Sequence, residues 1–476
     1  MSKQSTASAL QQVDLLITDA YVLTMDSIRR VFPNGAVAVS GREIVAVGRE
    51  QDVAQKVQAA KTIRAGGAVI HPGFIECHNH TTLHTARGAF GDTISWNDVV
   101  SDFYVPYWNT VTDEEEYAGT ALACLEMIRN GTTCFVEAGT AIEPDVVARA
   151  ATEVGIRALV GDPFLWDIGG FSSDAPSLSR APATTARALR LLGGQLWRNN
   201  DPDALVRGHI SLVGMASASD ELEIAAKEVA DRAHVVLNQH QSYCGVDVAD
   251  DDRRLGMHPL LHLEEIGVLG SNCVFAHMNL IREDEVNSVI RSGMAISWNA
   301  PASMMWGIGG ATHGRHAELY RAGVPVGLGS DSSNWANSFD IGRAANLAIL
   351  AARDGRRDRT ILTAEDGLTM AITNGARAVG LSDRIGSIEP GKRADLVIRT
   401  NNIPEVYPTT DPISALVYSS GSKNVDTVII DGKVVLENGY PTRVDATAIY
   451  LQVNRAARGV LGRMGYQTPQ RWPHFK

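Results

Sequence analysis

Two histidines end a short apolar run near the start of the chain, at His78 and His80. Alternate residues of a β-strand point to the same face, so both imidazoles would project into one space. Neutral imidazoles bind first-row divalent metals, and two side by side make half of such a site. A lone His-x-His could equally be a surface pair, because short motifs have a substantial false-positive rate. The motif therefore indicates a metal site only if further ligands converge on it.

Eight short apolar runs follow one another through the centre of the chain. They are 70–80, 132–137, 156–162, 206–214, 235–240, 273–277, 295–299 and 324–331. Stretches of helical periodicity, such as 115–128, 220–233 and 283–290, separate most of them. Strands that alternate with helices predict a parallel α/β sheet, and eight such units predict a closed (β/α)8 TIM barrel.

The ends of these runs carry further metal-competent side chains. The fifth run ends in His240, the sixth in His277 and the eighth in Asp331. Active sites of such barrels lie at the carboxyl ends of the strands. These three side chains should therefore meet His78 and His80 at one end of the barrel, which chance would not supply in register.

Both ends of the chain have a different texture, with short β-like runs broken by turns. These runs fill residues 13–70 and return at 394–398 and 425–435, where Asp431-Gly432 favours a hairpin turn. We expect them to form one small antiparallel β-sandwich domain from 1–71 and 386–446. The barrel would occupy 72–385, and 447–476 would form a C-terminal helix and tail.

The composition is that of an ordinary soluble globular protein. Of the 476 residues, 45% are hydrophobic and 20% are charged, and the net charge of −11 comes without any Lys/Arg-rich run. This pattern argues against nucleic acid and membrane partners. Five scattered cysteines in apolar runs indicate reduced thiols, and neither a signal-like segment nor a run of about 20 apolar residues occurs. We expect a cytoplasmic protein.

Several phrases resemble the amidohydrolase superfamily of metal-dependent hydrolases, across about residues 13–445. The phrases are Pro72-Gly73-Phe74-Ile75 before the two histidines, Gly131-Thr132-Thr133, and the closing segment 385–396. The resemblance implies a distorted barrel. The chain looks most similar to the phenylurea and molinate (thiocarbamate) herbicide hydrolases, and more distantly to triazine hydrolases and purine-type deaminases.

The resemblance implies one divalent ion per subunit. Four histidines would hold the ion: His78, His80, His240 and His277. Asp331 would be a further neighbour of the ion. The run 206–214 has no Lys or Glu that could bridge a second ion. The sequence leaves open whether His277 ligates directly or positions the attacking water. We expect zinc, with iron, cobalt or manganese as alternatives.

The fifth run departs from the deaminase and triazine branch, which usually has His-x-His-x-x-Glu there. Asn238 replaces the first His and Tyr243 replaces the Glu. That Glu shuttles a proton to the ring, whereas Tyr, with a pKa of about 10, does not readily accept one at pH 7. We therefore expect hydrolysis of a urea, amide or (thio)carbamate, such as an N-aryl urea herbicide. Asp331 would be the base and acid, His277 would position the water, and Tyr243 would donate to the oxyanion.

Two other functions are weighed against this one. A deaminase or dechlorinase of a triazine, purine or pterin ring is the alternative, and a barrel that only binds a ligand is disfavoured by the intact ligand set.

Polar and apolar residues near the strand ends could line a pocket for a small-molecule substrate, although core or turn roles are as common for such residues. They are His84, Trp166, Asn299, Met304, Trp306, His313 and Asn334. We also expect a homo-oligomer.

Overall fold

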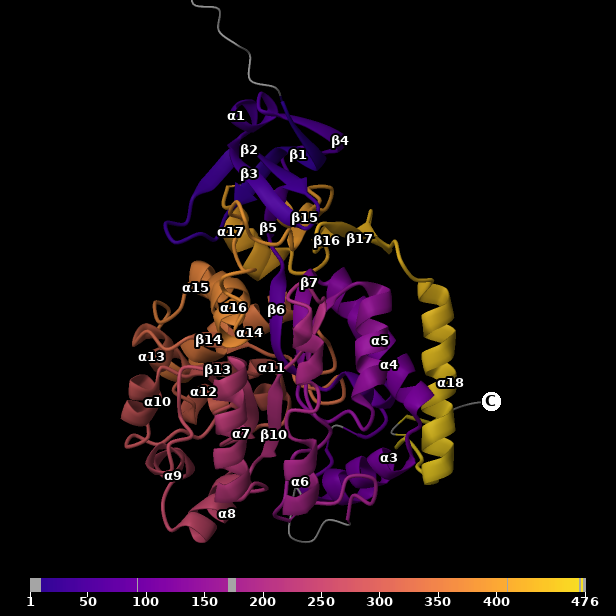
Figure 1. Ribbon diagram of the computed structural model, residues 1–476, viewed down its shortest axis with the longest axis vertical. Coiled ribbons are helices and arrows are strands. Elements are labelled where there is room, and N and C mark those ends of the chain that lie inside the picture. The colour runs from indigo at the N-terminus through magenta and orange to yellow at the C-terminus, as the bar shows by residue number, and fades with distance from the viewer. Residues whose placement is uncertain (1–9, 92, 170–176, 409, 471, 474–476) are drawn as a thin grey trace, which may run out of the picture.

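The computed structural model describes residues 10–91, 93–169, 177–408, 410–470 and 472–473. The outer ends of the first and last predicted domains therefore lie outside the described residues. Figure 1 shows a sheet domain at one end of the molecule and a larger barrel below it. The α/β architecture that the strand pattern predicts is confirmed.

Parallel strands form the barrel. They are β6 (Phe74–Asn79), β7 (Thr132–Glu137), β8 (Arg157–Val160), β9 (Val206–Gly208), β10 (Ile210–Gly214), β11 (Leu237–Gln241), β12 (Cys273–His277), β13 (Ala295–Trp298) and β14 (Val326–Leu328). Hydrogen bonds link β6 to β9 in one arc and β10 to β14 in another. The arcs separate at His209, between β9 and β10. They close at a parallel bridge between Asn79 and Asp331.

Helices cover the outside of the barrel, and several begin at the capping signals that the sequence contains. Before α4 (Asp113–Arg129), the Thr112 backbone N–H donates to Glu115 at 3.0 Å, which completes a capping box. The Ser219 hydroxyl accepts from Leu222 at the start of α7 (Asp220–Ala233). The others are α5 (Pro144–Val154), α6 (Thr185–Leu191), α8 (Gly245–Leu255), α9 (Pro259–Glu265), α10 (Val286–Ser292), α11 (Ala300–Met305), α12 (Gly310–His313), α13 (His316–Arg321), α14 (Ile341–Arg356), α15 (Ala364–Thr369) and α16 (Gly375–Ala378).

The sheet domain joins both ends of the chain. Its strands are β1 (Gln11–Leu23), β2 (Val31–Ser40), β3 (Glu43–Arg49), β4 (Val57–Arg64), β5 (Val69–Pro72), β15 (Leu396–Arg399), β16 (Val425–Ile430), β17 (Lys433–Glu437) and β18 (Tyr440–Pro441). β5 pairs with β1 on one side and β15 on the other. The expectation of a purely antiparallel sheet is wrong, because β4 and β5 both pair parallel to β1. The predicted hairpin forms at Asp431-Gly432, where both residues have positive φ, 51° and 75°.

The chain passes from the sheet domain to the barrel at Gly73, between β5 and β6. A Cβ on Gly73 would lie 2.0 Å from Thr133 Oγ1, so only glycine fits at this approach. A buried ion pair also joins the two parts, because Arg157 on β8 donates to Asp395 at 2.9 and 3.1 Å. The sheet domain thus fixes the start of the strand that carries His78 and His80.

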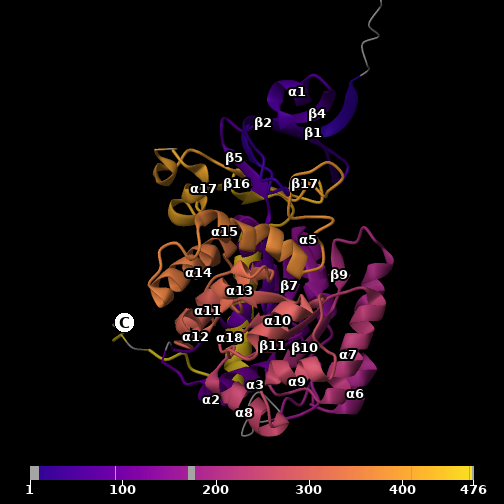
Figure 2. The same ribbon diagram turned by 90° about the vertical axis from the view of Figure 1, so that its left-hand side faces the viewer.

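A long connection between β6 and α4 covers the other end of the barrel. It contains the helical segments η1 (Thr81–Ala86), α2 (Trp96–Val99), η2 (Val100–Tyr104) and α3 (Val105–Thr110). Figures 1 and 2 both place α3 at the end away from the sheet domain. The C-terminal helix α18 (Ala446–Met464) packs on α3 and α4. Among the described residues, no helix combines the length and apolar character needed to cross a membrane.

Candidate metal centre and active site

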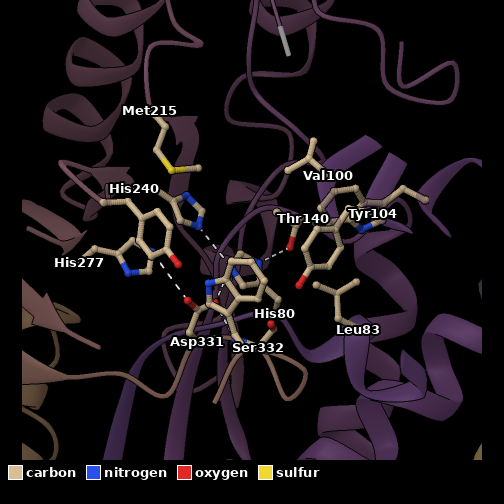
Figure 3. Close-up of a pocket in the computed structure, with 13 residues that line it drawn as sticks. His80, Leu83, Val100, Tyr104, Thr140, Met215, His240, His277, Asp331 and Ser332 are labelled. Carbon is tan, nitrogen blue, oxygen red and sulfur yellow. Dashed lines mark hydrogen bonds and ion pairs between the residues drawn. The ribbon is translucent and has the colours of Figure 1, made fainter. Parts of the chain in front are cut away.

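Three histidines converge at the carboxyl end of the barrel. The possible ligand atoms of His78, His80 and His240 all lie within 4.8 Å of one another. His80 Nε2 is 3.2 Å from His240 Nε2. Figure 3 draws this contact as a dashed line. In the described part of the chain, this is the only group of three or more His, Cys, Asp or Glu side chains with that convergence.

His277 and Asp331 complete the cluster. The His277 ring centroid is 5.2 Å from that of His78, and Asp331 Oδ1 lies 3.4 Å from His80 Nε2. Asp331 Oδ2 is 3.9 Å from His277 Nε2. Both residues have positive φ, 72° for His277 and 67° for Asp331, a conformation that non-glycine residues adopt at a cost. Such strain at the end of a strand is typical of functional sites, where it aims a side chain inward.

The imidazoles of the cluster are neutral. Burial, followed by the neighbouring rings, lowers the pKa of His78, His80 and His277 well below 6.5. Burial lowers the pKa of His240 to about 4. A neutral ring nitrogen keeps the lone pair that a metal ligand needs.

Neighbouring groups orient two of these residues. His240 Nδ1 lies 2.7 Å from the Val213 carbonyl, so Nδ1 carries the proton and Nε2 presents its lone pair to the cluster. His316 Nε2 donates to the His277 carbonyl at 2.7 Å and supports its strained backbone. Backbone contacts therefore fix where these imidazoles point.

Below the cluster, Glu76 joins the first and last strands of the barrel. Its carboxylate accepts from the His78 amide at 3.1 Å, and from the backbone N–H and the hydroxyl of Ser330. Burial raises the pKa of Glu76 to about 8. Asp331 is buried beside it, and burial raises the pKa of Asp331 well above its ordinary range. A cation in the cluster would favour the ionised form of Asp331.

The donor set fits a divalent cation. Within the described ranges of the chain, neither ring nitrogen of His78 makes a hydrogen bond of normal geometry, although both are buried, and Asp331 Oδ2 also lacks a hydrogen-bond partner. Buried polar atoms without partners are rare and call for an ion or water. Histidine and carboxylate donors suit zinc and its neighbours in the first row. β10 contributes no Lys or Glu to the cluster, which fits a single ion.

A pocket opens above the cluster, with walls that are largely aromatic and aliphatic. Leu83, Val100, Tyr104 and Trp108 come from the connection between β6 and α4. The remaining lining residues come from the ends of the barrel strands: His80, Thr140, Met215, His240, Tyr243, His277, Asp331, Ser332 and Trp335. The Tyr243 ring contacts His277 edge-on, with ring centroids 4.6 Å apart.

The structure thus brings together all the predicted ligands and catalytic residues. None of the seven residues predicted for the substrate pocket is among its lining residues. His84 is buried and its Nε2 lies 2.9 Å from Glu126, on the side of α4. The Trp166 indole donates to the Ala181 carbonyl at 2.8 Å. Both therefore support the surrounding structure.

The other five lie behind or outside the lining. Asn299 is buried and accepts from Ser297, and Met304 is 46% exposed. Trp306 packs on Trp335, with ring centroids 3.6 Å apart. His313 lines a separate outer groove, and Asn334 accepts from Tyr104 at 2.9 Å. Trp306 and Asn334 therefore reach the pocket only through a neighbour that lines it.

Most residues that line the pocket outside the metal cluster were not predicted from the sequence. Thr140 and Met215 follow the ends of β7 and β10, so the rule that sites gather at strand ends could have found them. Tyr104 and Trp108 lie on helical segments within the long connection. No local sequence signal distinguishes them from core aromatics.

Comparison of the sequence and fold with those of known proteins identifies the family of the chain. The pattern of the amidohydrolase family matches residues 69–435. The 5-methylthioadenosine/S-adenosylhomocysteine deaminase of Syntrophobacter fumaroxidans is 31% identical over 449 residues, which cover 94% of this chain and 99% of the relative.

Two solved structures share the fold. An adenosine deaminase from Xanthomonas campestris with bound zinc has a TM-score of 0.86 at 27% identity, and covers 96% of this chain and 100% of its own. Atrazine chlorohydrolase from Arthrobacter aurescens in complex with zinc has a TM-score of 0.83 at 23% identity, covering 93% and 100%. The histidine cluster, in a chain that matches the amidohydrolase family and the zinc-bound adenosine deaminase structure, confirms the prediction of one divalent metal ion, with zinc as the expected metal.

The comparisons overturn the prediction of a urea, amide or (thio)carbamate hydrolase related to phenylurea hydrolases. The relative that is 31% identical and the solved structure that is 27% identical are both deaminases by name, which favours the ring-directed alternative. The prediction treated the missing Glu at position 243 as decisive. Asp331 lies in the same pocket and can also move protons, so the absence of one carboxylate does not exclude attack on a ring. The family itself is established by sequence and fold together: the chain belongs to the amidohydrolase family.

Proposed function

We propose that the protein is a metal-dependent hydrolase that removes an amino group, or another exocyclic leaving group such as chloride, from an N-heteroaromatic ring. The observation that carries this proposal is the convergence of His78, His80 and His240 with Asp331 at the base of an aromatic pocket. The deaminase names of the relatives support the reaction class.

The three converging histidines would hold the cation, with Asp331 and His277 beside it. A divalent ion bound there supplies Lewis-acid chemistry, which makes water a nucleophile near neutral pH. The chain's own contribution is to present neutral imidazoles in a fixed arrangement and to surround the reacting atoms with apolar side chains.

Asp331 is the proposed proton carrier. Its carboxylate is the only one among the described lining residues of the pocket, and it lies between His80 and His277. It would accept a proton from the attacking water and return it to the leaving amine. His277, 3.9 Å from Asp331 Oδ2, would orient that water.

Tyr243 occupies the place where the deaminase branch usually has a carboxylate. Its ring lies edge-on to His277 and its hydroxyl is buried at the pocket wall. Burial, followed by the charge of Asp331, raises the pKa of Tyr243 well above 10, so the hydroxyl keeps its proton. We assign it as a hydrogen-bond donor to the ring nitrogen or to the charge that develops on the ring.

The pocket walls favour a flat, neutral ring with apolar substituents. The Tyr243 and Trp335 rings lie nearly parallel, with centroids 6.3 Å apart, and Tyr104 meets Trp335 at 5.6 Å. Leu83, Val100 and Met215 complete apolar surfaces that alkyl groups would contact. Stacking and apolar contact would hold the ring while Asp331 faces its exocyclic substituent.

The test is a substrate panel with zinc-loaded protein. The panel contains adenosine-type nucleosides, free aminopurines, and amino- and chloro-triazines with alkyl substituents, and ammonia and chloride release are measured. We expect release from at least one ring class, with the alkyl-substituted rings preferred over the nucleosides. Release of neither product by fully metal-loaded protein, together with cleavage of N-aryl ureas, would refute the proposal.

A further inference from the structure

A buried chain of polar contacts runs from the metal cluster to a carboxylate that does not line the pocket. His80 Nδ1 lies 2.6 Å from Thr140 Oγ1, and the Thr140 hydroxyl donates to Glu137 Oε1 at 3.2 Å (Figure 3 draws the first contact). Glu137 is fully buried, Thr140 is 1% exposed and His80 is 7% exposed. Both contacts are therefore buried.

The local backbone builds this arrangement around Glu137, the last residue of β7. Glu137 Oε2 accepts the Gly139 N–H at 2.9 Å, and Oε1 accepts the Thr140 N–H at 3.0 Å. Gly139 has a positive φ of 76°, which bends the chain around the carboxylate. The turn thus returns the Thr140 side chain toward His80.

The direction of these hydrogen bonds indicates which ring nitrogen of His80 carries the proton. A hydroxyl has one proton, and that of Thr140 goes to Glu137, whose two oxygens also accept the Gly139 and Thr140 N–H groups; in its ionised form this carboxyl can only accept. Thr140 Oγ1 must then accept from His80 Nδ1–H. The lone pair of His80 is consequently on Nε2, which faces His240 at 3.2 Å and Asp331 at 3.4 Å.

We propose that Thr140 and Glu137 are positioning residues for the metal centre, which hold His80 in the ligand-competent tautomer and orientation. The inference rests on the proposed role of His80 as a ligand. Glu137 does not line the pocket, whereas Thr140 is part of its wall; both would act on the ion through His80, because the Thr140 hydroxyl contacts the His80 ring. His240 has the Val213 carbonyl for the same purpose, so the side-chain relay to His80 is the one that substitution can remove.

The chemistry explains why a relay of this kind strengthens a site. A metal-bound histidine whose other nitrogen donates to a carboxylate, directly or through a hydroxyl, is a better electron donor and is fixed in rotation. Without the acceptor, the ring can flip or change tautomer, and both changes remove the lone pair from the cluster. The expected loss of metal affinity is about 10- to 100-fold.

The experiment compares zinc affinity by chelator competition, without substrate, for the wild type, Thr140→Val, Thr140→Ala, Thr140→Ser and Glu137→Gln. We expect the Val and Ala variants to bind zinc about 10- to 100-fold more weakly. Thr140→Ser should remain near wild type because it keeps the hydroxyl, and Glu137→Gln should lie between. Cobalt-substituted protein gives a second readout, because its absorption spectrum should change in Thr140→Val and return in Thr140→Ser.

Thr120→Val is the matched control. Thr120 is buried, and among the residues that the structure describes its hydroxyl hydrogen-bonds only with the Thr81 hydroxyl, at 3.1 Å, and with no histidine ring. It should lower thermal stability while leaving zinc affinity unchanged. If Thr140→Val and Thr140→Ala bind zinc as tightly as wild type, the inference is refuted. The zinc-affinity assay contains no substrate. Its result therefore does not depend on whether the protein turns over any substrate of the panel.

Discussion

Asp331 Oδ1 lies 3.4 Å from His80 Nε2, although the two residues follow the last and first strands of the barrel. The contact exists because the barrel closes at this point: Asn79 pairs with Asp331, and the Asp331 N–H donates to the His78 carbonyl at 3.0 Å. The barrel thus closes at the residues that form the reactive centre; we call this closure the seam of the barrel. Changes that loosen the seam should therefore reach the chemistry.

Removal of the metal should abolish turnover and destabilise the protein. Chelation removes the ion and leaves the lone pairs of the buried, neutral imidazoles facing one another without a partner. An ion at a thousandfold excess over its Kd contributes about 4 kcal/mol to folding stability. Metal analysis, activity and Tm should fall together on dialysis against chelator and recover together with zinc. Full activity of protein shown to be metal-free would contradict this.

Asp331→Asn should lose turnover without losing the ion. The amide cannot accept the proton of the attacking water, and general acid–base catalysis contributes about 100- to 10,000-fold. We expect kcat to drop within that range while zinc content stays near one per chain. Asp162→Asn serves as control, since Asp162 is buried but accepts from the backbone amides of Gly193, Gly194 and Gln195, away from the cluster. Near-native kcat in Asp331→Asn would exclude it as the base.

Tyr243→Phe tests the hydroxyl at the position of the missing carboxylate. Loss of a donor to developing charge should lower kcat by about 100-fold, with a smaller effect on KM. Tyr104→Phe is the comparison, because its hydroxyl donates to Asn334 rather than toward His277. Steady-state kinetics on the best ring substrate distinguish the two. Equal, small effects of both substitutions would mean that Tyr243 only shapes the pocket.

Trp335→Ala should weaken binding of the ring. Trp335 lies between Tyr243, Tyr104 and Trp306, so its loss removes one stacking surface and loosens the others. A loss of about 1.4 kcal/mol corresponds to a tenfold higher KM. Met304→Ala, at an exposed position on α11, should leave KM unchanged. An unchanged KM in Trp335→Ala would show that the ring lies elsewhere.

Glu223 on α7 should make the folding stability depend on pH. Burial, followed by the neighbouring charge of Asp251, raises its pKa from 4.5 to about 8, while Arg254 opposes the shift. The folded state therefore holds this proton more tightly than the unfolded state. Its contribution to stability is complete below pH 4.5 and is lost as the pH rises through 8.

The corresponding experiment is Glu223→Gln, followed by thermal unfolding from pH 5 to pH 8. The variant cannot ionise, so its Tm relative to wild type should rise across this range. Glu221→Gln, an exposed neighbour on the same helix, should show no such trend. A difference between Glu223→Gln and wild type that stays constant with pH would show that the carboxyl does not titrate as inferred.

The parts of the protein that follow from local rules could be predicted from sequence. The alternation of apolar runs with helical stretches gave the barrel, because both periodicities are properties of short segments. The ligand candidates followed from one further rule, that the carboxyl ends of parallel strands meet at one end of a barrel. His78, His80, His240, His277 and Asp331 are brought together in the structure for that reason.

The pocket could not be predicted in the same way. Tyr104 and Trp108 reach it only because a long connection folds back over the barrel, and Met304 misses it because its side chain lies on the exposed side of α11. Whether an aromatic residue lines a cavity or fills a core depends on packing between distant segments. The substrate prediction failed for a different reason: it took the missing carboxylate at position 243 to exclude a ring substrate, although the base and acid that it assigned to Asp331 is equally compatible with a ring.

By itself, the sequence determined which side chains can bind a metal and on which strand ends they stand, since these depend on residue type and on spacing of two or 3.6 residues. Only the tertiary structure decided how close they come, which His80 nitrogen faces the cluster, and which residues wall the pocket. Those properties arise from barrel closure at Asn79 and Asp331 and from the turn that carries Glu137 and Thr140. Both join segments that no local pattern relates.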